Sequence, residues 1–221
     1  MRVLVIGASR GIGLEFTKQY LVDGADVTAT ARDEAALAQL RQLGASAITL
    51  DVVKAASAAS LASQLVGVAF EIVLVCPGIY GPRQDGMEPP TQADFDDVMH
   101  TNVLGAMRVM PQIVDRLATG AKLAVVSSRM GSIGSRTAAN GWLYRASKAA
   151  LNSILKDTSI VLARRAICVA LHPGWVQTDM GGEQADLTVN DSVSRMRRVL
   201  DSLTADDNGR FLNHDGAAID W

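Results

Sequence analysis

Short runs rich in Val, Ile and Leu alternate along this chain with longer amphipathic segments, and this alternation limits the possible folds more than any other feature. Parallel strands need long crossover connections, usually helices, so the pattern predicts a parallel sheet covered by helices. The expected strands span 3–6, 26–30, 47–50, 72–75, 123–127, 167–171 and 210–212. The expected helices span 12–22, 34–43, 55–65, 91–117 and 143–163, with another after residue 190. We therefore expect a doubly wound α/β (Rossmann) sheet of about seven mostly parallel strands, with helices on both faces.

Bulk properties narrow the class of partner. The 221 residues suffice for one sizeable core, so we expect a single domain over 1–221. A net charge of -2 gives no clustered basic surface for nucleic acid or anionic membrane, which leaves a small molecule as the expected substrate. Cys76 and Cys168 lie in apolar runs and are expected to be unpaired thiols. The lack of a leader or of a membrane-length apolar stretch makes the cytoplasm the expected compartment.

Two polar loops interrupt the alternation after predicted strands. They span 77–90 and 177–190 and contain Gly or Pro. Ligands of open α/β sheets bind outside the carboxyl ends of the strands. Both loops are therefore candidate walls of a site.

A glycine-rich loop follows the first predicted strand. Gly7, Gly11 and Gly13 are spaced Gly-x-x-x-Gly-x-Gly and lead into the first helix. Glycines there permit a tight turn and a close approach of backbone amides to a pyrophosphate, which the helix N-terminus attracts. The spacing differs from the commoner Gly-x-Gly-x-x-Gly, and an ordinary strand-to-helix turn is the alternative interpretation.

Arg32 follows the second predicted strand, where dinucleotide-binding proteins distinguish their cofactors. An acidic residue there binds a ribose 2′-hydroxyl, whereas an arginine accommodates a 2′-phosphate. Arg32 and Arg10 would together form a cationic clamp, which favours NADP over NAD. In the alternative interpretation, Arg32 pairs with Asp33 or Glu34 in solvent.

Tyr144 and Lys148 begin a long predicted helix, and their four-residue spacing puts both on one face. A nearby cation favours phenolate, so we expect Lys148 to lower the pKa of Tyr144 toward the working pH of a general acid. Tyr144 would then give a proton to a substrate oxygen as hydride arrives. A chance pairing on a helix is the alternative.

The motifs together resemble those of the short-chain dehydrogenase/reductase family, from Arg2 to the end of the chain. The motifs that carry the resemblance are the glycine loop, Asp51 after the third strand, Asn102-Val103-Leu104-Gly105, Ser128 after the fifth strand, Tyr144-x-x-x-Lys148 and Pro173-Gly174-Trp175-Val176-Gln177-Thr178. The stretches 127–132 and 215–221 are similar to the family's C-factor-like branch of carbonyl reductases.

The resemblance implies a role for each matching residue. Ser128 would hold the substrate oxygen, Tyr144 would be the acid/base, Lys148 would bind the ribose, and Asn102 would support a water of the proton relay. Asp51 would accept from the adenine amine, and Val176 and Thr178 would fix the carboxamide. The remaining cofactor-binding residues would be Gly7, Ser9, Arg10, Gly11, Ile12, Gly13, Arg32, Val52, Gly78, Pro173 and Gly174. Without the resemblance, Asn102 would be a satisfied helix residue and Asp51 a helix cap.

The chain departs from the family pattern in two segments. Ile6 stands where threonine is usual, and Val75-Cys76-Pro77-Gly78 stands in place of Asn-Asn-Ala-Gly. Because the usual polar groups of the two segments support each other, losing both predicts replacement of a buried hydrogen bond by apolar packing.

Several assignments within the site stay open. Ser127 or Ser132 would be the alternatives to Ser128, and Trp142 would be either a substrate contact or an anchor for the helix start. The histidines His100, His172 and His214 are far apart in sequence and lack partners at metal spacing, so no metal is expected.

The leading interpretation is an NADP-dependent carbonyl reductase or alcohol dehydrogenase. A cofactor-binding sensor of the same fold is the alternative, although a sensor would not need Ser128, Tyr144, Lys148 and Asn102. A sugar-nucleotide epimerase or dehydratase would normally carry an added substrate domain, for which this chain has no room. A homodimer or homotetramer is expected by analogy.

Overall fold

The computed structural model describes residues 1–83 and 87–221; residues 84–86 of the expected loop 77–90 lie outside the described residues. Its sheet has seven strands in the order β3-β2-β1-β4-β5-β6-β7. The strands are β1 (Arg2–Ile6), β2 (Asp26–Ala31), β3 (Ser46–Thr49), β4 (Phe70–Val75), β5 (Leu117–Val126), β6 (Ala166–His172) and β7 (Arg210–Asn213). Each neighbouring pair is parallel, which confirms the predicted doubly wound sheet.

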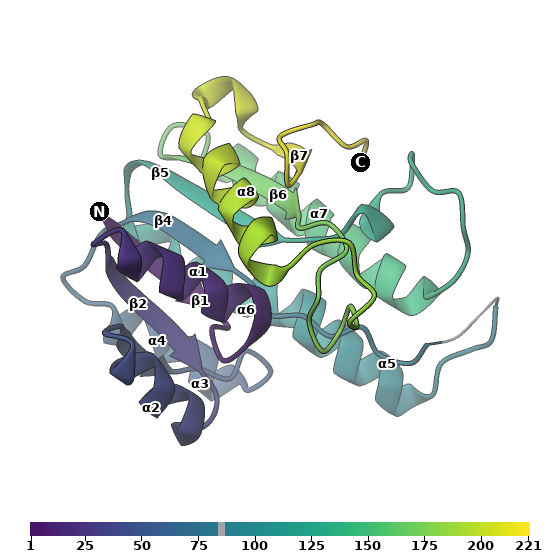
Figure 1. The fold of residues 1–221 in the computed structure, drawn as a ribbon, viewed down its shortest axis with the longest axis horizontal. Coiled ribbons are helices and arrows are strands. Elements are labelled where there is room, and N and C mark those ends of the chain that lie inside the picture. The colour runs from purple at the N-terminus through teal and green to yellow at the C-terminus, as the bar shows by residue number, and fades with distance from the viewer. Residues whose placement is uncertain (84–86) are drawn as a thin grey trace.

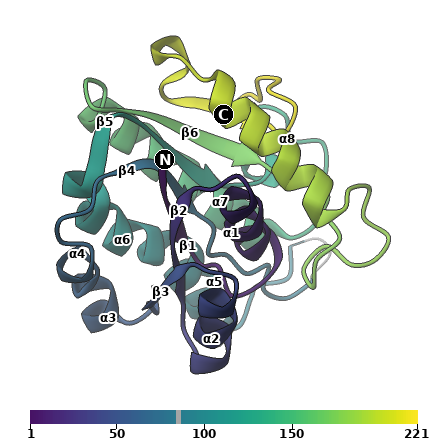
Figure 2. The same ribbon diagram turned by 60° about the vertical axis from the view of Figure 1, so that its left-hand side comes forward.

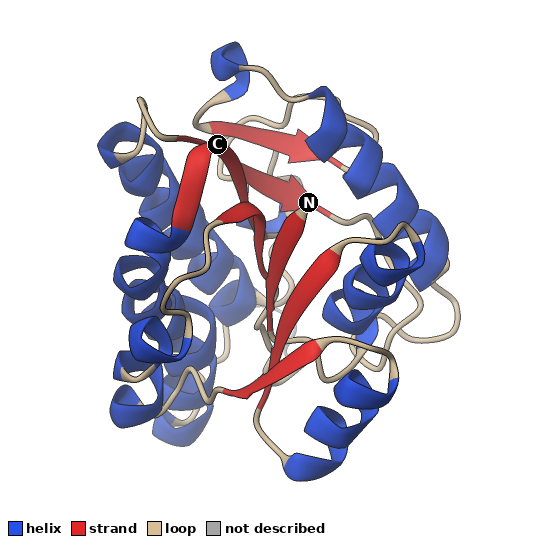
Figure 3. Ribbon diagram, turned by 90° about the vertical axis from the view of Figure 1, so that its left-hand side faces the viewer, coloured by secondary structure: helices blue, strands red, loops and turns tan. Residues whose placement is uncertain are grey.

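Helices cover both faces of this sheet (Figure 3). One face carries α1 (Gly11–Val22), α2 (Glu34–Gln42) and α8 (Val189–Ser202). The other carries α3 (Ala55–Ala59), α4 (Leu61–Gln64), α6 (Gly105–Ile113) and α7 (Trp142–Val161). The helix α5 (Gln92–Met99) leads into α6, and α8 lies beside α1 (Figures 1 and 2).

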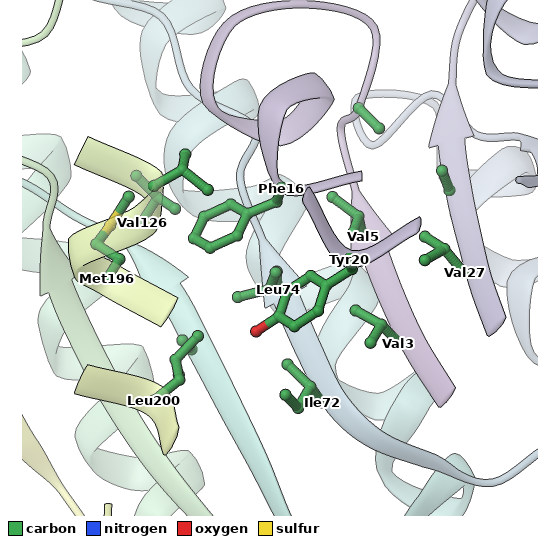
Figure 4. Close-up of a cluster of buried hydrophobic side chains, with 14 of the residues drawn as sticks. Val3, Val5, Phe16, Tyr20, Val27, Ile72, Leu74, Val126, Met196 and Leu200 are labelled. Atoms are coloured by element: carbon green, nitrogen blue, oxygen red, sulfur yellow. The ribbon is translucent and has the colours of Figure 1, made fainter. Parts of the chain in front are cut away.

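The core is divided by the sheet into two apolar layers, as parallel sheets covered on both faces require. In the layer beneath α1 and α8, Phe16 and Tyr20 lie over strand residues such as Leu74, with Met196 and Leu200 of α8 beside them (Figure 4). The second layer lies beneath α3, α4, α6 and α7 and includes Phe70 and Phe211. Both layers hold the strand ends in fixed positions.

Two expected helices differ from the observed ones. The helix expected over 55–65 is two short helices, because the Ser60 hydroxyl donates to the carbonyl of Ser57 (2.9 Å) and competes with the backbone ladder. The helix expected over 91–117 contains a π-helical turn (His100–Leu104) and ends after a 3₁₀ turn (Val114–Arg116).

The fifth strand starts earlier than its apolar run predicted. It starts at Leu117 instead of residue 123, because Leu117 pairs with Phe70 of β4 before the register shifts. Gly120, with φ +75°, lies in the irregular part, and its N–H donates to the carbonyl of Arg165 (2.8 Å). Pairing across the sheet, which local periodicity does not reveal, therefore sets this boundary.

The strand order changes direction between β1 and β4. At such a switch point, the connections leave toward opposite faces and open a crevice at the carboxyl ends of the strands. Gly7 follows β1 and Cys76 follows β4, so the glycine loop lies at this crevice. None of the described helices is long and apolar enough to cross a membrane.

Candidate active site

Three adjoining cavities lie at the carboxyl ends of the strands. Their volumes are about 470, 340 and 140 Å³. We call them the first, second and third cavities. Tyr144 lines both the first and the second, whereas Gly7 and Gly78 line both the second and the third. The three form one trench, with Tyr144 where the largest cavity joins the middle one.

The glycine loop lines the second and third cavities. Gly7 has φ +79°, and its N–H donates to Thr30 Oγ1 (3.0 Å). A Cβ on Gly13 would lie 2.2 Å from the carbonyl oxygen of Gly7, so only glycine allows helix α1 to approach the strand end. No side chain caps the N-terminus of α1 at Arg10, which leaves its N–H groups for an anion.

The two segments that depart from the family pattern contact each other directly. A Cβ on Gly7 would lie 2.9 Å from Pro77 Cγ, and Cys76 N–H donates to the carbonyl of Ile6 (3.0 Å). The contact between the segments is thus apolar packing plus one backbone hydrogen bond. This agrees with the predicted replacement of a polar pair by apolar packing.

Arg32 is exposed at the rim of the third cavity. Asp33 caps α2 by accepting from Ala36 N–H (2.9 Å), and Glu34 pairs with Arg41. Within residues 1–83 and 87–221, Arg32 makes no ion pair. The interpretation that Arg32 merely pairs with Asp33 or Glu34 is therefore wrong, and Arg32 lines the third cavity without a carboxylate within ion-pair distance among the described residues.

Arg10, the other half of the expected clamp, has a partner. Its guanidinium forms an ion pair with Asp179, and both side chains are largely exposed. Exposed ion pairs contribute roughly 0 to 1 kcal/mol, so an anion bound at the loop can displace Asp179 at little cost. Ser9 lines the third cavity beside Arg10 and Arg32.

Asp51 lies on the opposite wall of the third cavity. Its Oδ1 accepts from Val53 N–H (3.0 Å), and its Oδ2 is 3.7 Å from Lys54 Nζ. Asp51 therefore shapes its own loop, and the cap position of α3 belongs to Lys54. Val52, next to Asp51, also lines the cavity and packs against Gly105, where a Cβ would lie 2.9 Å from Val52 Cγ2.

Helix α7 presents Tyr144 and Lys148 to the trench from one face. Tyr144 is 7% exposed and Lys148 is 3% exposed. Lys148 Nζ donates to the carbonyl of Val126 (2.9 Å) at the end of β5 and lies 5.7 Å from the centroid of the Tyr144 ring. The backbone at Gly78 passes close to the ammonium, since a Cβ there would lie 3.1 Å from Lys148 Nζ.

The pKa of Tyr144 shifts in the direction opposite to the sequence-based prediction. Burial raises it to about 12, although a hydrogen bond from the Ser128 hydroxyl opposes the rise. Burial also lowers the pKa of Lys148 to about 8. The prediction that Lys148 lowers the tyrosine pKa is thus wrong for this structure, because desolvation of the buried phenol is the largest cause and raises the pKa.

The three candidate serines have different environments. Ser127 donates to Asn152 Oδ1 (2.5 Å), and Ser132 donates to the carbonyl of Asp220 (2.6 Å). Ser128 accepts only a backbone N–H, that of Met130 (3.2 Å), and lines the first cavity beside Tyr144. Unlike the other two hydroxyls, that of Ser128 donates to no backbone or carboxamide oxygen of the described residues, so Ser128 is the serine best placed to meet a substrate oxygen.

Asn102 lies in the π-helical turn and is 1% exposed. Its Oδ1 accepts from Ile79 N–H (2.8 Å), and its Nδ2 donates to the carbonyl of Ile79 (2.9 Å) and to Ser147 Oγ (2.9 Å). Asn102 thereby fixes the chain beside Gly78, at the junction of the second and third cavities. One lone pair of its Oδ1 remains available for a water.

The segment after β6 forms the wall opposite α7. Pro173, Gly174, Val176 and Thr178 line the first cavity, and Gly174 has φ +86°. Thr178 Oγ1 accepts from Gly181 N–H (3.1 Å), which folds the loop back on itself. Ile12 of α1 lines the first two cavities from the other side.

Both polar loops reach the first cavity, as predicted. Tyr80 and Arg83 come from one loop, and Thr178 and Met180 come from the other. Arg83 donates to the carbonyl of Met180 (2.7 Å), which joins the two loops. Trp142 is the first residue of α7 and does not line the first cavity, which argues against a substrate contact there.

Two contacts, one in the first cavity and one at its edge, were not predicted from the sequence. Tyr80 stacks on Tyr144, and the neighbouring strands β6 and β7 bring His172 and His214 together although they are far apart in sequence. No local sequence pattern indicates that two tyrosines will stack or that two distant histidines will lie on neighbouring strand ends. No group of three His, Cys, Asp or Glu in the described parts of the chain could hold a metal ion.

A trench that starts at a glycine-rich strand end and contains a buried tyrosine and lysine defines a nucleotide-binding α/β oxidoreductase. The family model of the short chain dehydrogenases matches residues 1–187. The chain belongs to this family, which confirms the resemblance seen in the sequence.

Individual relatives agree with this assignment. The chain is 42% identical to C-signal of Myxococcus xanthus over 134 residues, 58% of this chain and 81% of that protein. It is 31% identical to 1-hydroxy-2-glutathionyl-2-methyl-3-butene dehydrogenase of a Rhodococcus species over 99% of both chains. The crystal structure of an NADPH-bound carbonyl reductase from chicken fatty liver has a TM-score of 0.88 and 32% identity, covering 100% of this chain and 98% of that one. These similarities fit the C-factor-like branch.

Proposed function

We propose that this enzyme transfers a hydride between NADP(H) and a carbonyl/alcohol pair on a small substrate. The observation that carries the proposal is the position of Tyr144, between the largest cavity and the cavity lined by the glycine loop. A substrate carbonyl in the first cavity and a nicotinamide in the second would then meet at its phenol. The NADPH-bound relative, of similar fold, supports the choice of cofactor.

The residues of the chain fit a dinucleotide along the trench. The N–H groups at the start of α1 would bind the pyrophosphate, Arg32 a 2′-phosphate, and Asp51 and Val52 the adenine side. Lys148 would hold the ribose hydroxyls, and Val176 and Thr178 would hold the carboxamide. The bound cofactor supplies the hydride.

The side chains around the substrate oxygen supply the proton. Ser128 would donate a hydrogen bond to the carbonyl oxygen and orient it toward Tyr144. With a pKa raised to about 12, Tyr144 is a phenol at neutral pH and is ready to protonate the oxygen as the carbonyl carbon is reduced. A water that donates to Asn102 Oδ1 would relay a proton from bulk solvent to the phenolate, which restores the phenol and leaves the water neutral.

Turnover of a panel of substrates tests the proposal. Ketones, aldehydes, alcohols and one glutathionyl-linked alcohol would be assayed with NADP(H) and NAD(H) by the absorbance of the reduced nicotinamide. Reduction of several carbonyl compounds with NADPH is the expected result. Tight NADPH binding without turnover of any compound would instead favour the sensor interpretation.

A further inference from the structure

Three arginine residues line the cavity in which the proposed substrate binds. They are Arg83, Arg129 and Arg145. The lining contains no Asp or Glu among the described residues; Asp179 lines the second cavity and is paired with Arg10. The positive charge of the first cavity is therefore not balanced by its own walls.

Two of these arginines are held in place by neutral partners. Arg83 donates to the carbonyl of Met180 (2.7 Å). Arg145 is buried and donates to the carbonyl of Asn140 (2.7 Å) and to Asn140 Oδ1 (2.9 Å). Neutral acceptors satisfy hydrogen bonds but leave the charge in place, so both arginines keep an attractive field for an anion.

Arg129 is the arginine of the three whose side chain has no hydrogen-bond or ion-pair partner among residues 1–83 and 87–221. It is exposed and follows Ser128 directly. The charge of Arg129 acts on a residue of the cavity wall, His172. The pKa of His172 is lowered to about 4, mainly by burial and to a smaller extent by the Arg129 guanidinium and by His214. His172 lines the same cavity and is neutral at pH 7, so it adds no competing charge.

From this arrangement we infer that the physiological substrate carries an anionic group, such as a carboxylate, which Arg129 binds while the carbonyl lies between Ser128 and Tyr144. A guanidinium binds a carboxylate through two parallel hydrogen bonds and orients it as well as attracting it. The inference rests on the proposed function, because it names the substrate class of the same site.

A matched pair of substrates tests the inference. We would compare kcat/KM for 4-acetylbenzoate and for its methyl ester, which share the reacting ketone and differ in charge. The parent enzyme should favour the carboxylate about 10- to 100-fold, the effect of one hydrogen-bonded ion pair. Arg129→Gln should reduce this ratio to near one. Arg164→Gln, the same substitution at an exposed residue at the opposite end of the sheet, should keep it.

Each outcome decides a different claim. Equal or better turnover of the ester by the parent enzyme would overturn the inference and leave the proposed function standing. A preference that survives in Arg129→Gln would overturn the assignment to Arg129. If neither compound is reduced, calorimetric titration of 4-acetylbenzoate into the protein with NADP⁺ decides the inference, and the substrate panel described above decides the proposed function. Binding that is lost in Arg129→Gln would uphold the anion site, and no binding to the parent would overturn it.

Discussion

The ring of Tyr80 stacks on the ring of Tyr144, with centroids 4.6 Å apart and an interplanar angle of 24°. Gly141, which precedes α7, allows this contact, because a Cβ there would lie 2.4 Å from the Tyr80 hydroxyl oxygen. The stack covers one face of the Tyr144 ring and contributes to the burial of this residue. Burial of this kind raises the pKa of Tyr144 to about 12, which keeps its proton in place for carbonyl reduction.

The pH dependence of the reverse reaction follows from this pKa. Alcohol oxidation needs the phenolate as a base, and well below a pKa of about 12 its population rises about tenfold per pH unit. We expect kcat/KM for alcohol oxidation to rise without a plateau between pH 7 and about pH 9, measured by NADPH formation. A plateau below this pH would show that cofactor and Lys148 together lower the pKa, as the sequence alone suggested.

Substitution of Lys148 should separate stability from function. Burial lowers the pKa of Lys148 to about 8, so at pH 7 the folded protein holds a buried ammonium that the unfolded chain exposes to water. Lys148→Met removes this buried charge but also the hydrogen bond to the carbonyl of Val126. The net effect should be a rise in the free energy of unfolding at pH 7 of about 1 to 2 kcal/mol. The same substitution should lower both NADPH affinity and kcat.

The gain in stability from Lys148→Met should shrink as pH rises from about 8 to about 10.4. The reason is that Lys148 loses its proton at a lower pH in the folded parent protein than in the unfolded chain. Denaturant unfolding of both proteins at pH 7 and at about pH 9.5 measures this difference in the free energy of unfolding. The second pH lies between the pKa values of the folded and unfolded states. A gain that grows with pH would contradict the assigned cause.

Arg32 should set the choice between the two nicotinamide cofactors. Because its guanidinium pairs with no carboxylate of the described residues, Arg32→Ala should weaken NADPH binding about 10-fold or more and leave NADH binding nearly unchanged. Dissociation constants for both cofactors, by fluorescence titration, test this. Arg41→Ala is the control. Arg41 lies in α2, the helix that follows Arg32, and is paired with Glu34, so its loss should change neither dissociation constant. Equal binding of both cofactors by the parent would refute the role of Arg32.

The sequence predicted the sheet and most of the trench because both depend on local signals. Apolar runs gave all seven strands, and Gly7, Tyr144 and Lys148 lie together in the trench as their motifs implied. The start of β5 at Leu117 was missed, since pairing with Phe70 sets it. Lateral contacts of this kind have no periodicity along the chain.

The electrostatics of the site were the least predictable from the sequence. The spacing of Tyr144 and Lys148 showed that they share a face but not how deeply that face is buried, and burial decides the direction of both pKa shifts. The stacking of Tyr80 and the position of Arg129 beside the cavity depend on loop conformations. Only the packed structure shows them.

Replacement of one oxygen atom tests the central claim most directly. Tyr144→Phe keeps the ring against Tyr80 and removes the proposed proton donor, whereas Tyr20→Phe makes the same change in the core beneath α8, away from the cavities. Steady-state kinetics with NADPH and a reducible ketone should show a fall in kcat of about 100- to 10,000-fold for Tyr144→Phe, with NADPH affinity near that of the parent enzyme. The Tyr20→Phe control should retain parental activity. A Tyr144→Phe enzyme that keeps most of its turnover would contradict the assignment of Tyr144 as the acid/base.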